Sequence, residues 1–342
     1  RNPMESNLSN QAIILEDGKP VLKDIEDTPL AEGEIRIRVE ASPMNPSDQL
    51  WLAGLYGIKE LIPKKTLGAG FEGSGVVTEA HESVGADIVG KTVAFFEDCH
   101  NQGFQGLWRK YINKKASDVI QFPEHVKPDE AFAVFVNPLT AVYMINIAKK
   151  NGHKALIHGA ASSALGKMLV RYAKNIDFPV INIVRRQEQA DSLKELGAEH
   201  ILDSSSDTFD DDLAELSKEL GATAYFDPIA GAFCGRVLAK MPAKSTAHVY
   251  GALSGEAVSL NPIDIIFYQK SVTYLYLLTW FQEASKEEQD EVFGEVIKDL
   301  STGGKIFGTK IYKTFSLDKV VEACEEAAKT ASLGKVIINP QL

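Results

Sequence analysis

The segment that most constrains the fold of this chain spans residues 154–186, where a strand, a turn of small residues, a helix and a second strand follow one another. Residues 155–157 form a short apolar run typical of a buried parallel strand. Met168, Leu169 and Tyr172 then fall at helical spacing, and residues 179–184 form the second strand. This order predicts half of a dinucleotide-binding fold, with a phosphate at the turn, where free backbone N–H groups and the positive helix end meet.

The turn carries a reduced form of the glycine fingerprint found at such sites. Laid on Gly-x-Gly-x-x-Gly, its three positions are Ala161, Ser163 and Gly166, so only the last glycine is present. Alanine and serine are small enough for a pyrophosphate to approach, and serine adds a hydroxyl donor. Small residues before a helix also serve tight helix–sheet packing, so the turn alone does not establish a phosphate site.

Two arginines at the end of the second strand indicate which cofactor the turn would hold. A carboxylate at this place would bond the ribose hydroxyls of NAD, whereas this chain has Arg185 and Arg186. Guanidinium groups suit a 2′-phosphate. Two solvated surface arginines are the alternative, but next to such a turn the pair favours NADPH.

Composition limits the class of protein and its partners. The chain has 342 residues, enough for two domains, and a formal net charge of −11, which argues against a general affinity for nucleic acid or anionic membranes. Its three cysteines, Cys99, Cys234 and Cys324, are widely spaced and odd in number, which excludes a disulfide framework and is compatible with a reducing cytoplasm. The N-terminus has no apolar signal segment, and the most apolar windows are too short or too interrupted to span a bilayer. We therefore expect a soluble, cytoplasmic protein.

The pattern of strands and helices along the chain predicts an α/β protein with two domains. Up to about residue 133, short alternating strands are separated by glycine-rich turns, including a hairpin at Asp17-Gly18, which suggests a compact β-rich barrel. Six strands then alternate with helices as in a doubly wound parallel sheet, the last over residues 272–278. We predict domains at 1–135 and 136–282, with residues 283–342 returning to the first.

This arrangement resembles the medium-chain dehydrogenase/reductase superfamily, whose members join a GroES-like domain to an inserted Rossmann domain. The resemblance covers nearly the whole chain and is specific because several local motifs occur together. They are Asn45-Pro46-Ser47-Asp48, Gly70-Phe71-Glu72-Gly73-Ser74-Gly75, Val136-Asn137-Pro138-Leu139-Thr140-Ala141, the segment 193–201, and Gly334-Lys335-Val336.

The resemblance also implies that no metal is bound. Zinc-dependent members carry cysteine where this chain has Asn45 and histidine where it has Phe71, and neither replacement can ligate zinc. The lobe that usually holds four cysteines is represented by Cys99 alone, with His100 adjoining it. We interpret Asp98-Cys99-His100 as a loop with a buried thiol.

Within the superfamily, the chain is similar to the zinc-independent branch of quinone oxidoreductases and 2-enoyl thioester reductases. Asn45-Pro46-Ser47-Asp48 followed by Gly54-Leu55-Tyr56-Gly57 is similar to the enoyl thioester reductase pattern. In that group, the tyrosine matching Tyr56 is thought to bond the substrate carbonyl or supply the proton, and a neutral phenol suits either task. A tyrosine packed at a loop-to-helix junction is the alternative.

Other roles carry over from the resemblance position by position. Asn45 would contact the nicotinamide ribose or carboxamide, as would Thr140 at the same end of the cofactor. Gly251 would let the backbone pass close to the nicotinamide, and Lys335 would approach the adenosine phosphates unless it is a surface lysine. Asp48 is interpreted as a helix cap, and His158 and Cys234 as packing residues. The pyrophosphate would be cradled by Ser162, Ser163 and Gly166.

We therefore expect an NADPH-dependent, zinc-independent reductase that transfers hydride to a small-molecule quinone or α,β-unsaturated carbonyl in a cleft between the domains. The first alternative is a trans-2-enoyl thioester reductase of fatty-acid synthesis, with Lys59, Lys64 and Lys65 near an acyl-carrier or coenzyme A entrance. Trp51 departs from that pattern and would narrow an acyl pocket or cap the core. The second alternative is an NADPH-binding structural or regulatory protein without useful turnover.

The resemblance further implies a homodimer. The apolar segment 272–281 would pair with its copy across a two-fold axis and extend the sheet. A buried sixth strand in a monomer would have the same sequence.

Overall fold

The alternation of apolar strands and amphipathic helices in the middle of the chain produces a six-stranded parallel sheet. This sheet is seen in a computed structural model that describes residues 10–55, 68–101 and 103–342. The chain divides into two compact units: the first comprises Arg1–Phe135, Leu300–Gly304 and Thr309–Leu342, and the second Val136–Asp299 and Lys305–Gly308. Each unit is described by itself.

The second unit is a doubly wound α/β sheet. Its strands lie in the order β10-β9-β8-β11-β12-β13, with all neighbours parallel. The strands are β8 (Ala155–His158), β9 (Val180–Val184), β10 (His200–Asp203), β11 (Ala222–Asp227), β12 (Thr246–Val249) and β13 (Ser271–Tyr274). The order reverses between β8 and β11, and the carboxyl ends of strands at such a reversal are where ligands bind in open α/β sheets.

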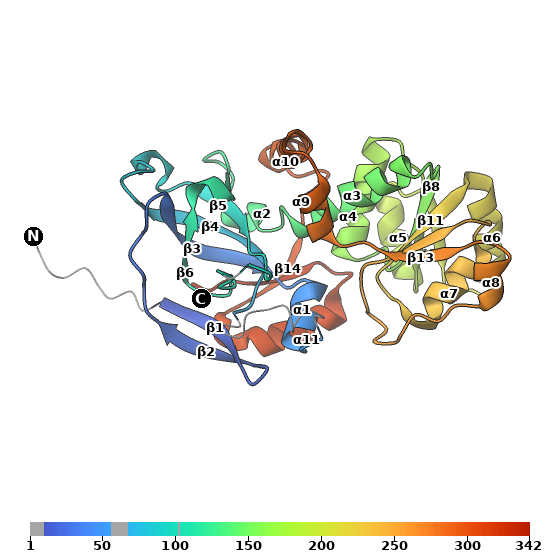
Figure 1. Cartoon of the computed structure of the whole chain (residues 1–342), viewed down its shortest axis with the longest axis horizontal. Coiled ribbons are helices and arrows are strands. Elements are labelled where there is room, and N and C mark those ends of the chain that lie inside the picture. Colours follow the sequence, from blue (N-terminus) through green and yellow to red (C-terminus); the bar gives the residue numbers. More distant parts are fainter. Residues whose placement is uncertain (1–9, 56–67, 102) are drawn as a thin grey trace, which may run out of the picture. The chain divides into compact units, whose positions relative to one another are not determined.

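Helices cover both faces of this sheet. Figure 1 shows α3, α4 and α5 on one side and α6 and α7 on the other, in keeping with separate apolar clusters on the two faces. The helices are α3 (Val136–Lys150), α4 (Ala164–Asn175), α5 (Gln187–Glu195), α6 (Phe209–Leu220), α7 (Gly231–Lys240), α8 (Pro262–Ile266), α9 (Leu277–Glu283) and α10 (Lys286–Ser301). The central strand β8 is buried along its whole length, as a strand covered on both faces must be.

The first unit is β-rich. Its main sheet has the order β14-β15-β3-β4-β5-β7, with β6 paired to β3, and β1 and β2 form a separate hairpin. Asp17 and Gly18 both have positive φ at the hairpin turn, as a tight primed turn requires. The strands are β1 (Asn10–Glu16), β2 (Lys19–Ile25), β3 (Glu34–Pro43), β4 (Glu72–Ala80), β5 (Thr92–Phe96), β6 (Tyr111–Lys115), β7 (Val119–Gln121), β14 (Ile311–Phe315) and β15 (Lys335–Ile338).

Short helices connect these strands. The α-helices are α1 (Pro46–Leu52), α2 (Pro128–Ala131) and α11 (Val320–Thr330), and the 3₁₀ turns are η1 (Ala86–Ile88), η2 (Ala116–Asp118) and η3 (Leu317–Lys319). The alternation predicted for β3 is confirmed, because Ile35, Ile37 and Val39 are completely buried. The fold class, a six-stranded doubly wound parallel sheet together with a β-rich domain, is therefore confirmed.

Two boundaries differ from the sequence-based prediction. The sixth strand was expected over residues 272–278, but β13 ends at Tyr274 and a helix begins at Leu277. That helix buries Trp280, whose ring contacts Phe281 and Phe293. The segment 272–281 is therefore half strand and half helix, because packing of its aromatic residues overrides their strand preference.

The return to the first unit also lies later than residue 283. Almost all of α10 belongs to the second unit, and so does the short segment Lys305–Gly308. Asp299 holds this segment by accepting hydrogen bonds from the backbone N–H groups of Ile306 and Phe307. The ring of Phe307 packs against Tyr172 of α4.

Only one helical stretch among the described residues, Pro128–Lys150, is long and apolar enough to cross a membrane by composition. It is 78% buried inside the protein. A buried apolar helix of this kind is expected in the core of an α/β unit.

Candidate active site

The turn after β8 is built as tightly as its small residues suggest. Ala160 has a φ of 48°, a left-handed conformation that is uncommon for a residue with a side chain. The backbone N–H of Ala161 donates to Ile183 O on β9 at 3.0 Å, and the N–H of Ser163 donates to Ala160 O at 3.1 Å. These bonds hold the turn against the carboxyl edge of the sheet, where strain at a functional site is often found.

Helix α4 begins at this turn with its first backbone donors directed outward. Ser163 is the N-cap, and its Oγ accepts a hydrogen bond from Gly166 N at 3.1 Å. A Cβ at Gly166 would lie 2.1 Å from Ala161 O, so only glycine fits there. Ala164 and Leu165, the first residues of the helix, have no intrahelical acceptor for their N–H groups. Together with the hydroxyl of the buried Ser162, this geometry fits a pyrophosphate.

Arg185 and Arg186 lie where β9 ends and α5 begins. Both side chains are exposed, and neither forms an ion pair with another described residue. The backbone N–H of Arg185 donates to Gln189 Oε1 at 3.0 Å, which fixes the strand-to-helix turn. Two exposed guanidinium groups directly after the strand that neighbours β8 are suited to bind a 2′-phosphate.

The loops after β11 and β12 approach each other at the same edge of the sheet. Asp227, the last residue of β11, is completely buried, and its Oδ1 accepts from the N–H groups of Ile229 and Ala230. Ala230 is held at a φ of 62°. A Cβ at Gly251 would lie 2.7 Å from Pro228 O, so the absence of a side chain lets this residue pack against the loop after β11. Its place beside nicotinamide stays a prediction.

A buried histidine–tyrosine pair links the last residue of β8 to the residue that follows β12. His158 ends β8 with no exposed surface, and its Nε2 lies 2.5 Å from the Tyr250 hydroxyl. Burial lowers the pKa of His158 to about 3, so the ring is neutral. Its Nδ1 has no hydrogen-bond partner among the described residues. His158 is thus a packing residue, as predicted. Among the described residues, only one of its two ring nitrogens, Nε2, has a hydrogen-bond partner.

Cys234 is also a buried packing residue. Its side chain has no exposed surface, and burial raises the pKa of the thiol well above its ordinary value, with the nearby Asp227 adding to the effect. A protonated, buried thiol is a poor nucleophile.

In the first unit, Asn45 starts α1 and is almost completely buried. Its Nδ2 donates to Glu72 Oε1 at 2.8 Å, and its backbone N–H donates to Asp48 Oδ2 at 2.8 Å. Asp48 is therefore the helix cap that the sequence predicts. Burial raises the pKa of Asp48 to about 7, although the Asn45 N–H opposes the shift, and the negative charge of Glu72 adds to it.

Lys335, the first residue of β15, faces the same carboxylates. It is only 8% exposed, so the alternative of a surface lysine is wrong. Burial lowers the pKa of Lys335, while Glu72 and Asp48 oppose that shift by attraction. Sequence reasoning missed Glu72 as a member of this group. The sequence feature that could have identified Glu72 is a charged residue at the start of an apolar strand, directly after Phe71.

The two positions that carry zinc ligands in the metal-dependent members have other tasks here. The Asn45 amide is committed to Glu72, and Phe71 is 4% exposed. The rings of Trp51, Phe71 and Phe104 pack with centroids 5.5–5.9 Å apart, and Trp51 Nε1 donates to Gly68 O at 2.8 Å. Trp51 is thus a core residue, as one of its two interpretations held.

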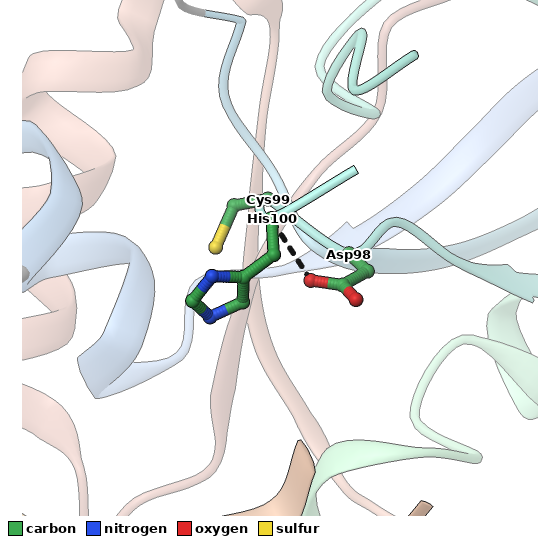
Figure 2. Close-up of side chains that lie close together, drawn as sticks. All are labelled: Asp98, Cys99 and His100. Carbon is green, nitrogen blue, oxygen red and sulfur yellow. Dashed lines mark hydrogen bonds between the residues drawn. The ribbon is translucent and has the colours of Figure 1, made fainter. Parts of the chain in front are cut away.

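Asp98, Cys99 and His100 come together in one loop, with their potential ligand atoms within 4.8 Å of one another. Figure 2 shows the thiol beside the imidazole and the Asp98 carboxylate bonded to the His100 backbone, where its Oδ1 accepts from N–H at 2.8 Å. Burial, and secondarily Asp98, raises the pKa of Cys99 to about 12. The thiol is therefore protonated at neutral pH, as a buried packing residue would be.

Two further positions were predicted from the sequence, Thr140 and Tyr56. Thr140 is buried in α3, and its hydroxyl donates to Val136 O, which leaves its oxygen as an acceptor. Tyr56, together with Lys59, Lys64 and Lys65, lies outside the described residues, so its catalytic role stays a prediction.

The six-stranded parallel sheet and the turn before α4 have the form of a dinucleotide-binding fold, and comparisons with known proteins identify the family. Residues 31–124 match the alcohol dehydrogenase GroES-like domain, and residues 164–292 match the zinc-binding dehydrogenase family. The chain belongs to the medium-chain dehydrogenase/reductase superfamily of NAD(P)H oxidoreductases. This membership confirms the resemblance drawn from the sequence motifs.

Similar proteins have several named activities. The chain is 24% identical to a mitochondrial enoyl-[acyl-carrier-protein] reductase from Xenopus tropicalis over 86% of this chain and 85% of that protein. It is 23% identical to a 2-haloacrylate reductase from a Burkholderia species over 96% of this chain and 98% of the other. A provisionally assigned NADPH:quinone reductase structure from Mesorhizobium loti has a TM-score of 0.83 at 27% identity, covering 98% of this chain and 100% of its own.

Proposed function

We propose that this protein is an NADPH-dependent, zinc-independent reductase that transfers hydride to a small-molecule quinone or α,β-unsaturated carbonyl. The observation that carries the proposal is that the turn at Ser163–Gly166 follows β8, while Arg185 and Arg186, which form no ion pair with the described residues, follow the neighbouring strand β9. The named activities of the similar proteins, which reduce quinones or activated alkenes, support the substrate class.

The described residues fit the cofactor. Ser162, Ser163 and the N–H groups that open α4 would hold the pyrophosphate, with Gly166 allowing the helix to start close against the backbone of Ala161. Arg185 and Arg186 would hold the 2′-phosphate. Asn45 Oδ1 accepts no hydrogen bond from the described residues, and the Thr140 hydroxyl, which donates to Val136 O, retains acceptor capacity on its oxygen. Both oxygens suit the hydroxyl and carboxamide donors at the nicotinamide end.

Hydride transfer requires that the protein bind the cofactor and the substrate and supply one hydrogen-bond donor to the substrate. When bound, the dihydronicotinamide supplies hydride from C4 to an electrophilic carbon. The charge that develops on the acceptor oxygen then requires a hydrogen-bond donor, and we assign this task to the Tyr56 hydroxyl. A polarising metal is unnecessary for substrates whose negative charge delocalises onto oxygen, which agrees with the aromatic and amide roles of Phe71 and Asn45.

The decisive experiment compares substrates and cofactors side by side. NADPH and NADH oxidation would be followed with an aromatic quinone, a simple enone and a trans-2-enoyl thioester, for the wild type and for Tyr56→Phe. We expect turnover of the quinone or enone with a preference for NADPH. Strong thioester turnover that collapses in Tyr56→Phe would establish the enoyl reductase alternative instead. NADPH binding without oxidation by any acceptor would indicate a non-enzymatic role.

A double arginine variant tests the predicted preference for NADPH over NADH. In Arg185→Ala/Arg186→Ala the affinity for NADPH should fall by about tenfold or more, whereas the affinity for NADH should change little, because only NADPH carries the 2′-phosphate. An equal loss for both cofactors would contradict the assignment of the two arginines.

We also propose that the protein is a homodimer joined through β13. Among the described strands, β13 is paired on one side only, to β12. The adjacent α8 exposes Ile263, Ile265 and Ile266, and Phe267 directly after it is 70% exposed. An open strand edge beside exposed apolar side chains is a surface suited to pairing with a second copy.

A further inference from the structure

The Asn45 amide is held in one orientation by Glu72. Its Nδ2 donates to Glu72 Oε1 at 2.8 Å, and both side chains are 1% exposed. An ionised carboxylate only accepts hydrogen bonds, so the NH₂ end of the amide must face it. The two ends of an amide look alike in shape, and here the chemistry of the partner decides between them.

The opposite end of the amide has no partner among the residues that the structure describes. Asn45 Oδ1 is buried and accepts no hydrogen bond from any other described residue. A buried acceptor without a donor destabilises the folded protein, because it has lost its hydrogen bonds to water. A ligand donor at this oxygen would therefore contribute a hydrogen bond without first displacing a protein donor.

Glu72 is itself fixed on several sides. Its Oε2 accepts from the backbone N–H of Phe135 at 3.1 Å, and its backbone oxygen accepts from Ser42 Oγ at 2.7 Å. The buried ammonium of Lys335 attracts its charge. Rotation of the carboxylate would break the hydrogen bond from Phe135 N–H, so the orientation of the Asn45 amide is determined by Glu72.

We propose that Glu72 is a positioning residue that presents Asn45 Oδ1 as the hydrogen-bond acceptor for the nicotinamide end of NADPH. The donor would be a ribose hydroxyl or the carboxamide N–H, while Glu72 touches no ligand. This inference rests on the proposed function, which assigns NADPH to the chain and Asn45 to that end of the cofactor.

The test exchanges the donor and acceptor roles of the two residues. In Glu72→Gln, the glutamine oxygen must still accept from Phe135 N–H, so its NH₂ faces Asn45 and forces the Asn45 amide to flip. We expect the dissociation constant for NADPH, measured by fluorescence titration, to rise by about tenfold. Binding of 2′,5′-ADP, which lacks the nicotinamide half, should be unchanged and serves as the internal control.

The reciprocal variant separates positioning from mere stability. Asn45→Asp alone places two carboxylates face to face and should also weaken NADPH binding. In Asn45→Asp/Glu72→Gln, the glutamine NH₂ donates to the aspartate, whose second oxygen again faces the ligand. We expect the double variant to bind NADPH within about threefold of the wild type, and thermal unfolding verifies that each variant is folded.

The outcomes are distinct. An unchanged NADPH affinity in Glu72→Gln, or a double variant that binds no better than Asn45→Asp, would overturn the inference and leave the proposed function intact. A wild-type protein that does not bind NADPH would overturn both. Should Glu72→Gln alone fail to fold, the comparison of Asn45→Asp with the double variant still decides, because only positioning predicts recovery.

Discussion

Gly166 is the residue at which the phosphate turn tolerates substitution least. A Cβ there would lie 2.1 Å from Ala161 O, and that oxygen belongs to backbone that hydrogen bonds hold in place. We expect Gly166→Ala to destabilise the protein by about 1–3 kcal/mol and to weaken NADPH binding by about tenfold or more. Urea unfolding and fluorescence titration measure the two effects.

Gly294→Ala is the matched control for this substitution. Gly294 lies inside α10, is exposed, and would have nothing within 4 Å of an added Cβ. Alanine is the better helix former, so this variant should gain up to about 1 kcal/mol of stability with unchanged NADPH affinity. Similar behaviour of the two variants would contradict the close approach at Gly166.

The buried carboxyl of Asp48 predicts a stability that depends on pH. Its pKa is raised to about 7 in the folded protein, mainly by burial, against ~3.9 in the unfolded chain. Between about pH 4 and pH 7, the folded state therefore keeps a proton that the unfolded state releases, and stability falls as pH rises through this window. Above pH 7 the loss is complete, with an upper bound of roughly 4 kcal/mol.

Asp48→Asn removes this titration and keeps an oxygen that accepts from Asn45 N–H. We expect the variant to match the wild type near pH 4 and to become progressively more stable than it up to pH 7. Urea unfolding of both proteins across this range gives the difference. A difference that is constant with pH would show that Asp48 does not titrate in this window.

Residues that act locally were predictable, whereas the buried charge cluster was not. The cap role of Asp48 follows from its place three residues after Asn45, and the turn at Ser163 follows from its small neighbours. Lys335 and Glu72 are far apart in the sequence and lie on different strands. Lys335 is therefore buried and attracted to Glu72 only once the first unit has folded.

At the scale of elements, alternation and periodicity predict most of the second unit. Helix α6, over Phe209–Leu220, begins and ends where its acidic first turn and the left-handed Gly221 indicate. The error at residues 275–278 has a different origin, because an apolar run with aromatic residues suits either a strand or a buried helix. Packing of Trp280 decided between them.

At the scale of the whole molecule, the open edge of β13 and the exposed apolar residues of α8 predict a dimer. Replacing Ile266, which is 64% exposed, and Phe267 by glutamate should convert the dimer to a monomer, because charge would be buried at the interface. Size exclusion with light scattering measures the state. Val321→Glu, at an exposed apolar residue of α11, is the matched control and should leave it unchanged. A wild-type monomer at micromolar concentration would contradict the proposal.

The sequence by itself determined the fold class, the order of the six parallel strands along the chain and the place of the phosphate turn, because these depend on local periodicity and small residues. Only the tertiary structure decided which buried groups meet. Glu72 and Lys335 come from different strands of the first unit, and Asn45 precedes a helix. The contact between Asn45 and Glu72 sets the orientation of the Asn45 amide. Long-range packing, not local spacing, brings the Glu72 carboxylate to the NH₂ group of Asn45.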